Sequence, residues 1–297
     1  MPIIALFVLS LLWGSTFFLT KLLLIDFHPV SIVFYRCLFG MLGLLPFFLW
    51  KKKKEDFNRL PNLIMITLIS AGIPWVFMSL SLKGLDTTIS GVLNASGPII
   101  GTILSVVILK RVIPKHEIWS VLIGFAGICI TILAGMNGNS QFHVGSAALL
   151  LFAVCFYSMS AIFSSMYLKH CSVYTLSFIT MALGTIYSGV FMLFIEPMSF
   201  RNFVDWKPFL LFIAIGMVSS GFGNMLYYYL VKSGGGLFAL LVTYLMPIMT
   251  ILLGVIFLEE NVSIGMVVGL FFVLASVYLM NKKRVYKKGV TKDEYAS

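Results

Sequence analysis

Ten apolar stretches of about 20 residues each constrain this chain more than any other feature of its sequence. A helix needs roughly that many predominantly apolar residues to cross a hydrocarbon core of about 30 Å. Charged residues, Pro, Gly or Asn bound each stretch. We expect spans at residues 3–24, 29–50, 62–82, 87–109, 117–135, 144–167, 173–195, 207–230, 236–258 and 262–280. The sequence therefore predicts an all-α integral membrane protein with ten transmembrane helices joined by short connections.

The composition agrees with lipid as the solvent for most of the protein surface. Of the 297 residues, 60% are hydrophobic and only 11% are charged, a balance far from that of a soluble domain. The first apolar stretch has no basic start and no small-residue cleavage site, so we expect a retained helix rather than a signal peptide. Only residues 282–297 form a separate basic tail, which we expect to be disordered or associated with the membrane surface.

The distribution of basic residues predicts the orientation of the chain. With the amino terminus in the cytoplasm, the inner segments hold sixteen of the 21 Lys and Arg residues, including the run from Lys51 to Lys54. The outer connections hold only Lys83, Arg201 and Lys207. Because basic loops stay on the cytoplasmic side, we expect both termini to be cytoplasmic in a multi-pass protein of the cell (inner or plasma) membrane. The net charge of +10 thus reflects topology, and it does not indicate a nucleic-acid partner.

The sequence also repeats itself after 149 residues, a shift that places Pro98 on Pro247 without a gap. The predicted units are residues 1–140 and 141–281, each with five helices. An odd number of helices inverts the second unit relative to the first, and inverted repeats are typical of secondary transporters. We therefore expect two inverted five-helix repeats with a substrate site between them near the bilayer midplane. Some channels and lipid-handling proteins also contain inverted repeats.

A set of short motifs extends over nearly the whole chain. The motifs are Trp13-Gly14-Ser15-Thr16 with Lys21, His28-Pro29, Arg36, and the stretch from Pro247 to Leu258-Glu259-Glu260 and Gly269. In their order and spacing they resemble the EamA-type family of the drug/metabolite transporter (DMT) superfamily. The resemblance implies a ten-helix carrier, commonly an exporter of amino acids or other metabolites. The family often has an acidic residue after its fourth helix, whereas this chain has Lys110 and Arg111 there.

The two matching prolines predict where helices bend. Pro98 and Pro247 each lie near the middle of a predicted span. Because proline lacks an amide hydrogen, the carbonyls of Asn94 and Thr243 lose their helical partners. Freed backbone acceptors at this depth are tolerated where they face protein or a wet cavity. We predict that these two helices line the substrate path, with the prolines as kink or gating positions; kinking for packing alone is the alternative.

Arg36 is the ionisable residue that lies most clearly inside a predicted span. It follows the start of the second helix by seven residues, which places it about 10 Å below the outer end. A charge at that depth is costly and therefore a functional candidate. A planar guanidinium suits a carboxylate or phosphate on a substrate. A structural role, through bonds to helix carbonyls or a pairing with Asp26, is the alternative.

Aromatic and amide side chains complete the candidate substrate site. Together with Arg36, the candidates are Trp13, Trp75, Asn94, Asn224, Tyr228, Thr243 and Tyr244. A buried Asn needs a hydrogen-bond partner and favours the cavity, whereas Trp75 and the tyrosines could instead anchor the helices at the membrane interface. All eleven Asp and Glu residues fall in connections, helix ends or the tail. This placement favours zwitterionic or anionic cargo over lipophilic cations.

The sequence as a whole predicts a secondary transporter that moves a small amino-acid-like or other carboxylate-bearing metabolite outward by alternating access. Multidrug or cation efflux is one alternative, and a non-transporting membrane scaffold is another. We find no nucleophile with a base and no metal-ligand spacing, so we expect no enzyme, metal or cofactor. The expected partners are the substrate and the lipid bilayer. Small residues at a spacing of four, including Gly265 and Gly269, are interpreted as helix-packing positions, and a homodimer stays possible.

Overall fold

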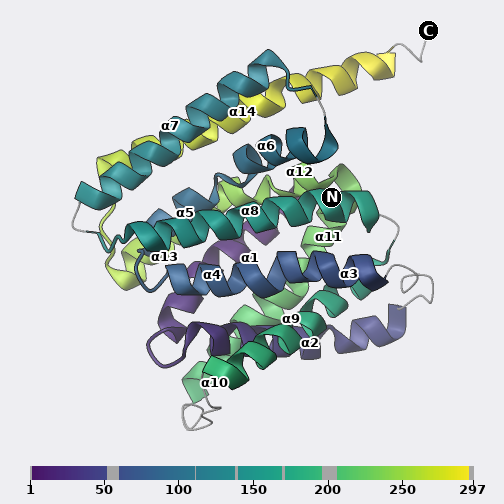
Figure 1. Cartoon of the computed structure of the whole chain (residues 1–297), viewed down its shortest axis with the longest axis vertical. Helices are drawn as coiled ribbons and strands as arrows, with labels where there is room; N and C mark the ends of the chain where they lie inside the picture. The colour runs from purple at the N-terminus through teal and green to yellow at the C-terminus, as the bar shows by residue number, and fades with distance from the viewer. Residues whose placement is uncertain are drawn as a thin grey trace.

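The computed structural model describes residues 2–51, 60–110, 112–137, 140–168, 171–195 and 206–293. All elements named within these ranges are helices, and they pack side by side in one bundle (Figure 1). Nine helical spans in this part of the chain are long and apolar enough to cross a membrane. Several basic residues on which the predicted orientation depends lie outside the described residues, namely Lys52 to Lys54, Arg59, Arg111, Lys169 and Arg201.

The helices follow the hydropathy pattern closely. The nine spans are α1 (Pro2–Leu23), α2 (Pro29–Lys51), α3, η2 and α4 (Leu60–Thr67, Leu68–Gly72, Ile73–Ser81), α5 and α6 (Thr87–Asn94, Gly97–Leu109), α7 (Lys115–Asn137), α8 (Val144–Tyr167), α9 (Val173–Ile195), α10, η4 and α11 (Trp206–Phe212, Ile213–Phe222, Gly223–Gly234), and α12 and α13 (Gly236–Ala239, Val242–Leu258). The tenth expected span corresponds to α14 (Ile264–Asp293), which contains a shorter apolar helix at Ile264–Ser276. The helical backbone of α14 continues to Asp293, beyond the expected end at residue 280.

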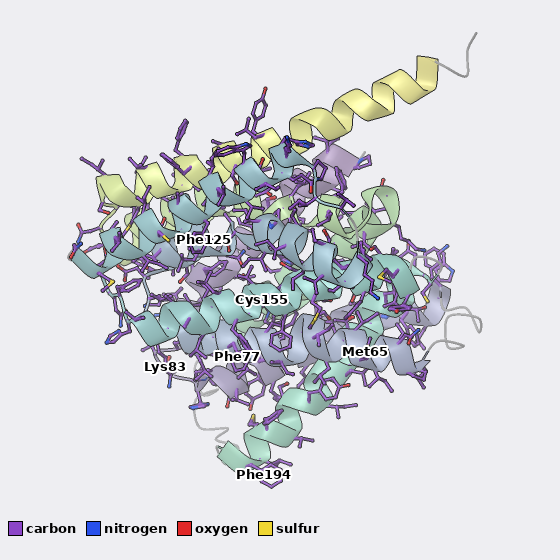
Figure 2. All side chains as sticks on the ribbon, turned by 45° about the horizontal axis from the view of Figure 1, so that its top comes forward. Met65, Phe77, Lys83, Phe125, Cys155 and Phe194 are labelled. Carbon is purple, nitrogen blue, oxygen red and sulfur yellow. The ribbon has the colours of Figure 1, made fainter. Side chains whose placement is uncertain are left out.

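Large apolar side chains cover the outside of the bundle (Figure 2). Phe194 is 85% exposed and Phe125 is 61% exposed, whereas Ser120 and Thr131 are completely buried. Polar side chains that face the bundle interior and apolar ones that face outward suit a lipid solvent, in which an exposed hydroxyl would lack partners. The chain is thus a multi-pass membrane protein.

Helices α7 and α14 form a pair at one edge of the bundle (Figure 1). Their backbones approach closely, because a Cβ added at Gly127 would lie only 2.7 Å from the carbonyl oxygen of Gly269. A Cβ at Gly265 would lie 2.6 Å from the Cβ of Ala134. The packing role predicted for Gly265 and Gly269 is therefore confirmed in this helix pair.

Several helix ends recur at the 149-residue shift. Leu109 ends α6 and Leu258 ends α13, and each is followed by a residue with left-handed backbone angles. These residues are Lys110, with φ of 49°, and Glu259, with φ of 54°. Left-handed conformations are uncommon outside glycine, so their recurrence at matching positions links the two halves. The π-helices recur as well, since η2, moved by 149 residues, falls within η4.

The helix breaks differ in detail from the predicted proline kinks. Asn94 ends α5 and α6 begins at Gly97, so Pro98 lies in the first turn of a new helix rather than inside a bent one. Proline is well tolerated there because the first amides of a helix have no intrahelical acceptor. Pro247 does lie inside α13, and the break in that half precedes it, between Ala239 and Val242. The two halves thus break at slightly different positions.

Candidate functional site

A cavity lies between helices from the first and second halves of the chain. The first half contributes lining residues from α1, α2, η2, α4, α5 and α6, and the second half contributes them from α8, α11 and α13. The cavity leaves about 60 Å³ for the centres of water molecules. One water needs roughly 10–15 Å³ on this measure, so the cavity holds a few waters in this conformation.

Six of the eight predicted substrate-site residues line this cavity. They are Trp13, Arg36, Trp75, Asn94, Asn224 and Thr243. Tyr228 is fully buried but faces α9, where its hydroxyl lies 2.8 Å from Thr180 Oγ1. Tyr244 is buried in the hydrophobic core of the bundle, away from the cavity lining. The prolines Pro98 and Pro247 do not line it either, although Gly97, the neighbour of Pro98, does.

Arg36 is the most unusual member of the lining. It is only 3% exposed, and its guanidinium lies 3.9 Å from the centre of the Trp75 ring. Its Nε donates a hydrogen bond to Ser220 Oγ, while its buried Nη1 has no hydrogen-bond partner. The contacts that the structure gives for the Arg36 guanidinium are thus with Ser220 and Trp75. Arg36 therefore presents an unsatisfied donor and an unneutralised charge at the cavity.

The π-helix η4 holds several of these lining side chains in place. Ser220 Oγ donates to the carbonyl of Ile215 five residues earlier, at 2.7 Å, and accepts from Arg36. The side-chain Nδ2 of Asn224 donates a hydrogen bond to the backbone carbonyl of Ser220 at 2.8 Å. The indole nitrogen of Trp13 donates to the Ser219 carbonyl at 3.1 Å. A widened helical turn thus orients three predicted site residues, which fits the frequent occurrence of π-helical turns at functional sites.

The matching π-helix of the first half contributes directly to the lining. Ser70 of η2 lines the cavity and donates to the carbonyl of Thr67. At the 149-residue shift Ser70 falls on Ser219, so the two π-helices place serines at equivalent positions. Sequence reasoning missed these serines. The signal was present in the match of Ser70-Ala71-Gly72 with Ser219-Ser220-Gly221.

Other lining residues were also missed by the sequence analysis. Tyr157 and Ser160 come from α8, and Tyr227 from α11. The Tyr227 ring packs against Trp13 with 5.3 Å between ring centres. Ser160 Oγ is buried and has no hydrogen-bond partner. The described lining therefore combines one cation, aromatic rings and neutral hydrogen-bonding groups, which can bind a ligand non-covalently.

A polar network ties several connections together at the end of α1. Lys21 Nζ donates to the carbonyls of Leu82 and Leu85 at 2.9 and 2.8 Å, and to Gln141 Oε1 at 2.8 Å. An ammonium has three hydrogens to donate, so Lys21 is fully satisfied. The α4–α5 and α7–α8 connections also pair directly, through Asp86 N and the carbonyl of Gln141 at 3.0 Å.

Two carboxylates complete this network. Glu260 accepts from the amides of Thr87 and Thr88 at 2.7 and 2.8 Å, which caps the beginning of α5. Asp86 accepts from the amide of Gln141 at 3.0 Å. Burial raises the pKa of the Asp86 carboxyl above its ordinary value, and the negative charge of Glu260 raises it further. The Gln141 amide and the Lys21 ammonium lower the same pKa, but their effects are smaller.

Comparisons with known proteins show which family and fold this chain resembles. The model of the EamA-like transporter family matches residues 1–133 and 145–282. The chain is 23% identical to an uncharacterized transporter of Archaeoglobus fulgidus over 278 residues, covering 92% of this chain and 95% of that protein. It is 27% identical to the uncharacterized transporter YvbV of Bacillus subtilis over 290 residues, covering 94% and 91%. A solved crystal structure with 14% identity has the same fold, with a TM-score of 0.72 over 96% of this chain and 98% of that one.

Proposed function

Since this chain belongs to the EamA-like transporter family, we propose that it exports a small carboxylate-bearing metabolite, amino-acid-like or otherwise, by alternating access. The chain is a membrane transporter by family, and its relatives are named transporters rather than enzymes. The proposal adds the class of substrate, the direction and the mechanism.

The proposal is supported mainly by the burial of the Arg36 guanidinium without an opposite charge among the contacts that the structure describes for it. A buried charge without a partner destabilises a protein strongly, because desolvation is not offset by an opposite charge. Arg36 has a hydroxyl and an aromatic ring as partners, and its Nη1 is left without an acceptor beside the cavity. A substrate carboxylate would supply both the missing charge and the missing acceptor. A lipophilic cation would instead be repelled.

The proposed architecture is a ten-helix carrier with two inverted repeats, residues 1–140 and 141–281, followed by a basic tail at 282–297. The recurrence of helix ends, left-handed residues and π-helices at the 149-residue shift supports this division. The excess of Lys and Arg in alternate connections supports cytoplasmic termini in the cell membrane.

Alternating access accounts for the small cavity. Ligand pockets usually enclose about 300–1,000 Å³, whereas this cavity leaves about 60 Å³ for water centres. The helices must therefore separate to admit a metabolite. Lys21, near the end of α1, bonds to the α4–α5 and α7–α8 connections. Opening of the bundle at this end would break these contacts.

Counterflow in proteoliposomes tests the proposal. Transport of labelled carboxylates, amino acids, cations and phosphorylated compounds would be compared in the wild type, Arg36→Gln and Arg36→Lys. Lys83→Gln, which removes a positive charge from an exposed side chain, is the matched control. We expect the wild type and the control to move a carboxylate, and Arg36→Gln to move it at least about tenfold more slowly. Wild-type rates in Arg36→Gln, or movement of cations only, would contradict the proposal.

A further inference from the structure

We propose that the transported solute is a monoanionic organic acid with a flat apolar body and no ammonium group. This inference rests on the proposed role of Arg36 as the carboxylate partner, and it narrows the substrate class of the same cavity. It separates simple organic acids from amino acids, which the proposed function leaves together.

The first step is the charge balance of the cavity. Among the 18 described residues that line it, Arg36 alone is charged. The carboxylates of Asp86 and Glu260 lie in connections between helices and accept hydrogen bonds from Gln141, Thr87 and Thr88. A solute with one net negative charge would neutralise the charge of Arg36. A dianion would leave the cavity with a net negative charge, and a zwitterion would leave it with a net positive charge.

The second step is the position that an ammonium would take. In an α-amino acid the ammonium and carboxylate are attached to the same carbon, so both lie within a few ångström of the guanidinium. Coulomb energy falls only as the inverse of distance, and repulsion of the ammonium by Arg36 would therefore cancel much of the attraction of the carboxylate. The amide oxygen of Asn94 and the hydroxyl of Ser160 offer acceptors in the lining, but they offer no opposite charge.

The third step is the shape of the walls. The Arg36 guanidinium carbon lies over the Trp75 ring, 3.9 Å from its centre, and Trp13 packs against Tyr227 with an interplanar angle of 33°. Met78 and Met246 fill further parts of the lining with flexible thioethers. Aromatic side chains favour stacking on flat apolar groups, and methionine adapts to their outline. A flat apolar body attached to the carboxylate fits these walls better than a short polar one.

A set of probes with one carbon skeleton tests the inference in the intact wild-type protein. Binding of 3-phenylpropionate, phenylalanine, 3-phenylpropionamide and 3-phenylpropylamine to the protein in nanodiscs would be measured by calorimetry, with propionate as the probe that lacks the apolar body. We expect 3-phenylpropionate to bind at least about tenfold more tightly than each of the others. Lys83→Gln should keep this order, and Arg36→Gln should abolish the preference for 3-phenylpropionate over its amide.

The outcomes distinguish the two levels of the account. Phenylalanine binding as tightly as 3-phenylpropionate, with both lost in Arg36→Gln, would overturn the inference and leave the carboxylate role of Arg36 intact. Propionate binding as tightly as 3-phenylpropionate would overturn the inference that the solute has a flat apolar body. Equal binding of acid and amide, or no binding of any probe, would overturn the proposed carboxylate function together with the inference. The central comparison uses the wild type, so it does not depend on whether Arg36→Gln folds.

Discussion

At the scale of single residues, the central feature is a buried guanidinium held by weak neutral partners. Trp75 contributes a cation–π contact, worth about 2 kcal/mol or more in a desolvated setting, and Ser220 contributes one hydrogen bond. These partners fix the plane of the guanidinium without neutralising it. The charge stays available to a solute.

Ser220→Ala tests this positioning. The substitution removes the acceptor of Arg36 Nε without removing the charge, so we expect substrate affinity to fall about three- to tenfold, as for one buried hydrogen bond. Ser220→Thr, which retains a hydroxyl, should restore part of the loss. Ser233→Ala, in an exposed position of α11, is the matched control. Unchanged affinity in Ser220→Ala would mean that the π-helix does not orient Arg36.

The raised pKa of Asp86 predicts a pH dependence of stability. Its ordinary value is 3.8, and the folded state binds the proton more tightly, so the free energy of unfolding should increase as the pH falls through the raised pKa toward 3.8. Glu260 and Lys21 are the charged groups that act on the Asp86 carboxyl. Thermal unfolding at several pH values should show this trend, and Asp86→Asn should flatten it; an identical trend in both proteins would refute it.

Six of the eight residues predicted for the substrate site line the cavity, but the sequence did not predict the rotation of each helix about its axis. Three tyrosines in a row, Tyr227 to Tyr229, cannot all face inward, and hydropathy does not distinguish among them. In the structure Tyr227 lines the cavity, whereas Tyr228 faces Thr180. Tyr157 was missed because α8 contains other aromatic residues, such as Phe152 and Phe156, that pack elsewhere.

At the scale of helices, the hydropathy pattern predicted span ends well because lipid leaves no partners for an unpaired backbone. It did not predict the π-helices η2 and η4, because a widened turn changes neither composition nor length enough to be seen in one sequence. It also placed the bend at Pro98, whereas the helix breaks earlier, between Asn94 and Gly97, and Pro98 lies in the first turn of α6. Tertiary packing decides such local choices.

Lys21→Met tests the network that joins the connections. Loss of three hydrogen bonds from one ammonium should loosen the α4–α5 and α7–α8 connections. We expect amide hydrogen exchange to increase at least about tenfold in residues 82–87 and 140–144. Lys83→Met removes the same charge from an exposed side chain of the same connection and should leave exchange unchanged. Equal exchange in the two variants would show that the network does not depend on Lys21.

Gly127→Leu tests the close approach of α7 and α14. A side chain at this position would meet the Gly269 carbonyl oxygen, with the Cβ at 2.7 Å. Overpacking typically lowers the free energy of unfolding by about 1–3 kcal/mol. Gly145→Ala is the control, because no atom lies within 4 Å of its added Cβ. A melting temperature of Gly127→Leu equal to that of the control would contradict the packing role.

At the scale of the whole molecule, hydropathy alone predicted a multi-pass membrane protein, whereas the division into two inverted repeats rests on one internal shift and stays a prediction. The sequence could not predict the size of the cavity or the conformation in which the helices close around it. It also could not give the length of α14, whose basic end continues as a helix to Asp293. These properties depend on how the two halves fit together, which no local pattern records.

In the proposed mechanism, the two halves of the chain expose one central cavity to each face of the membrane in turn. Cysteines at Asn94 and Thr243, introduced after replacement of the four native cysteines, would be labelled with a membrane-impermeant thiol reagent from each side. Ile103→Cys, at a 45% exposed position of α6 that faces outward, would be the lipid-facing control. The account predicts labelling of both cavity positions from both faces, protection by a transported carboxylate, and no labelling of the control. Labelling from neither face would identify a packed scaffold, and labelling from one face only would contradict alternating access.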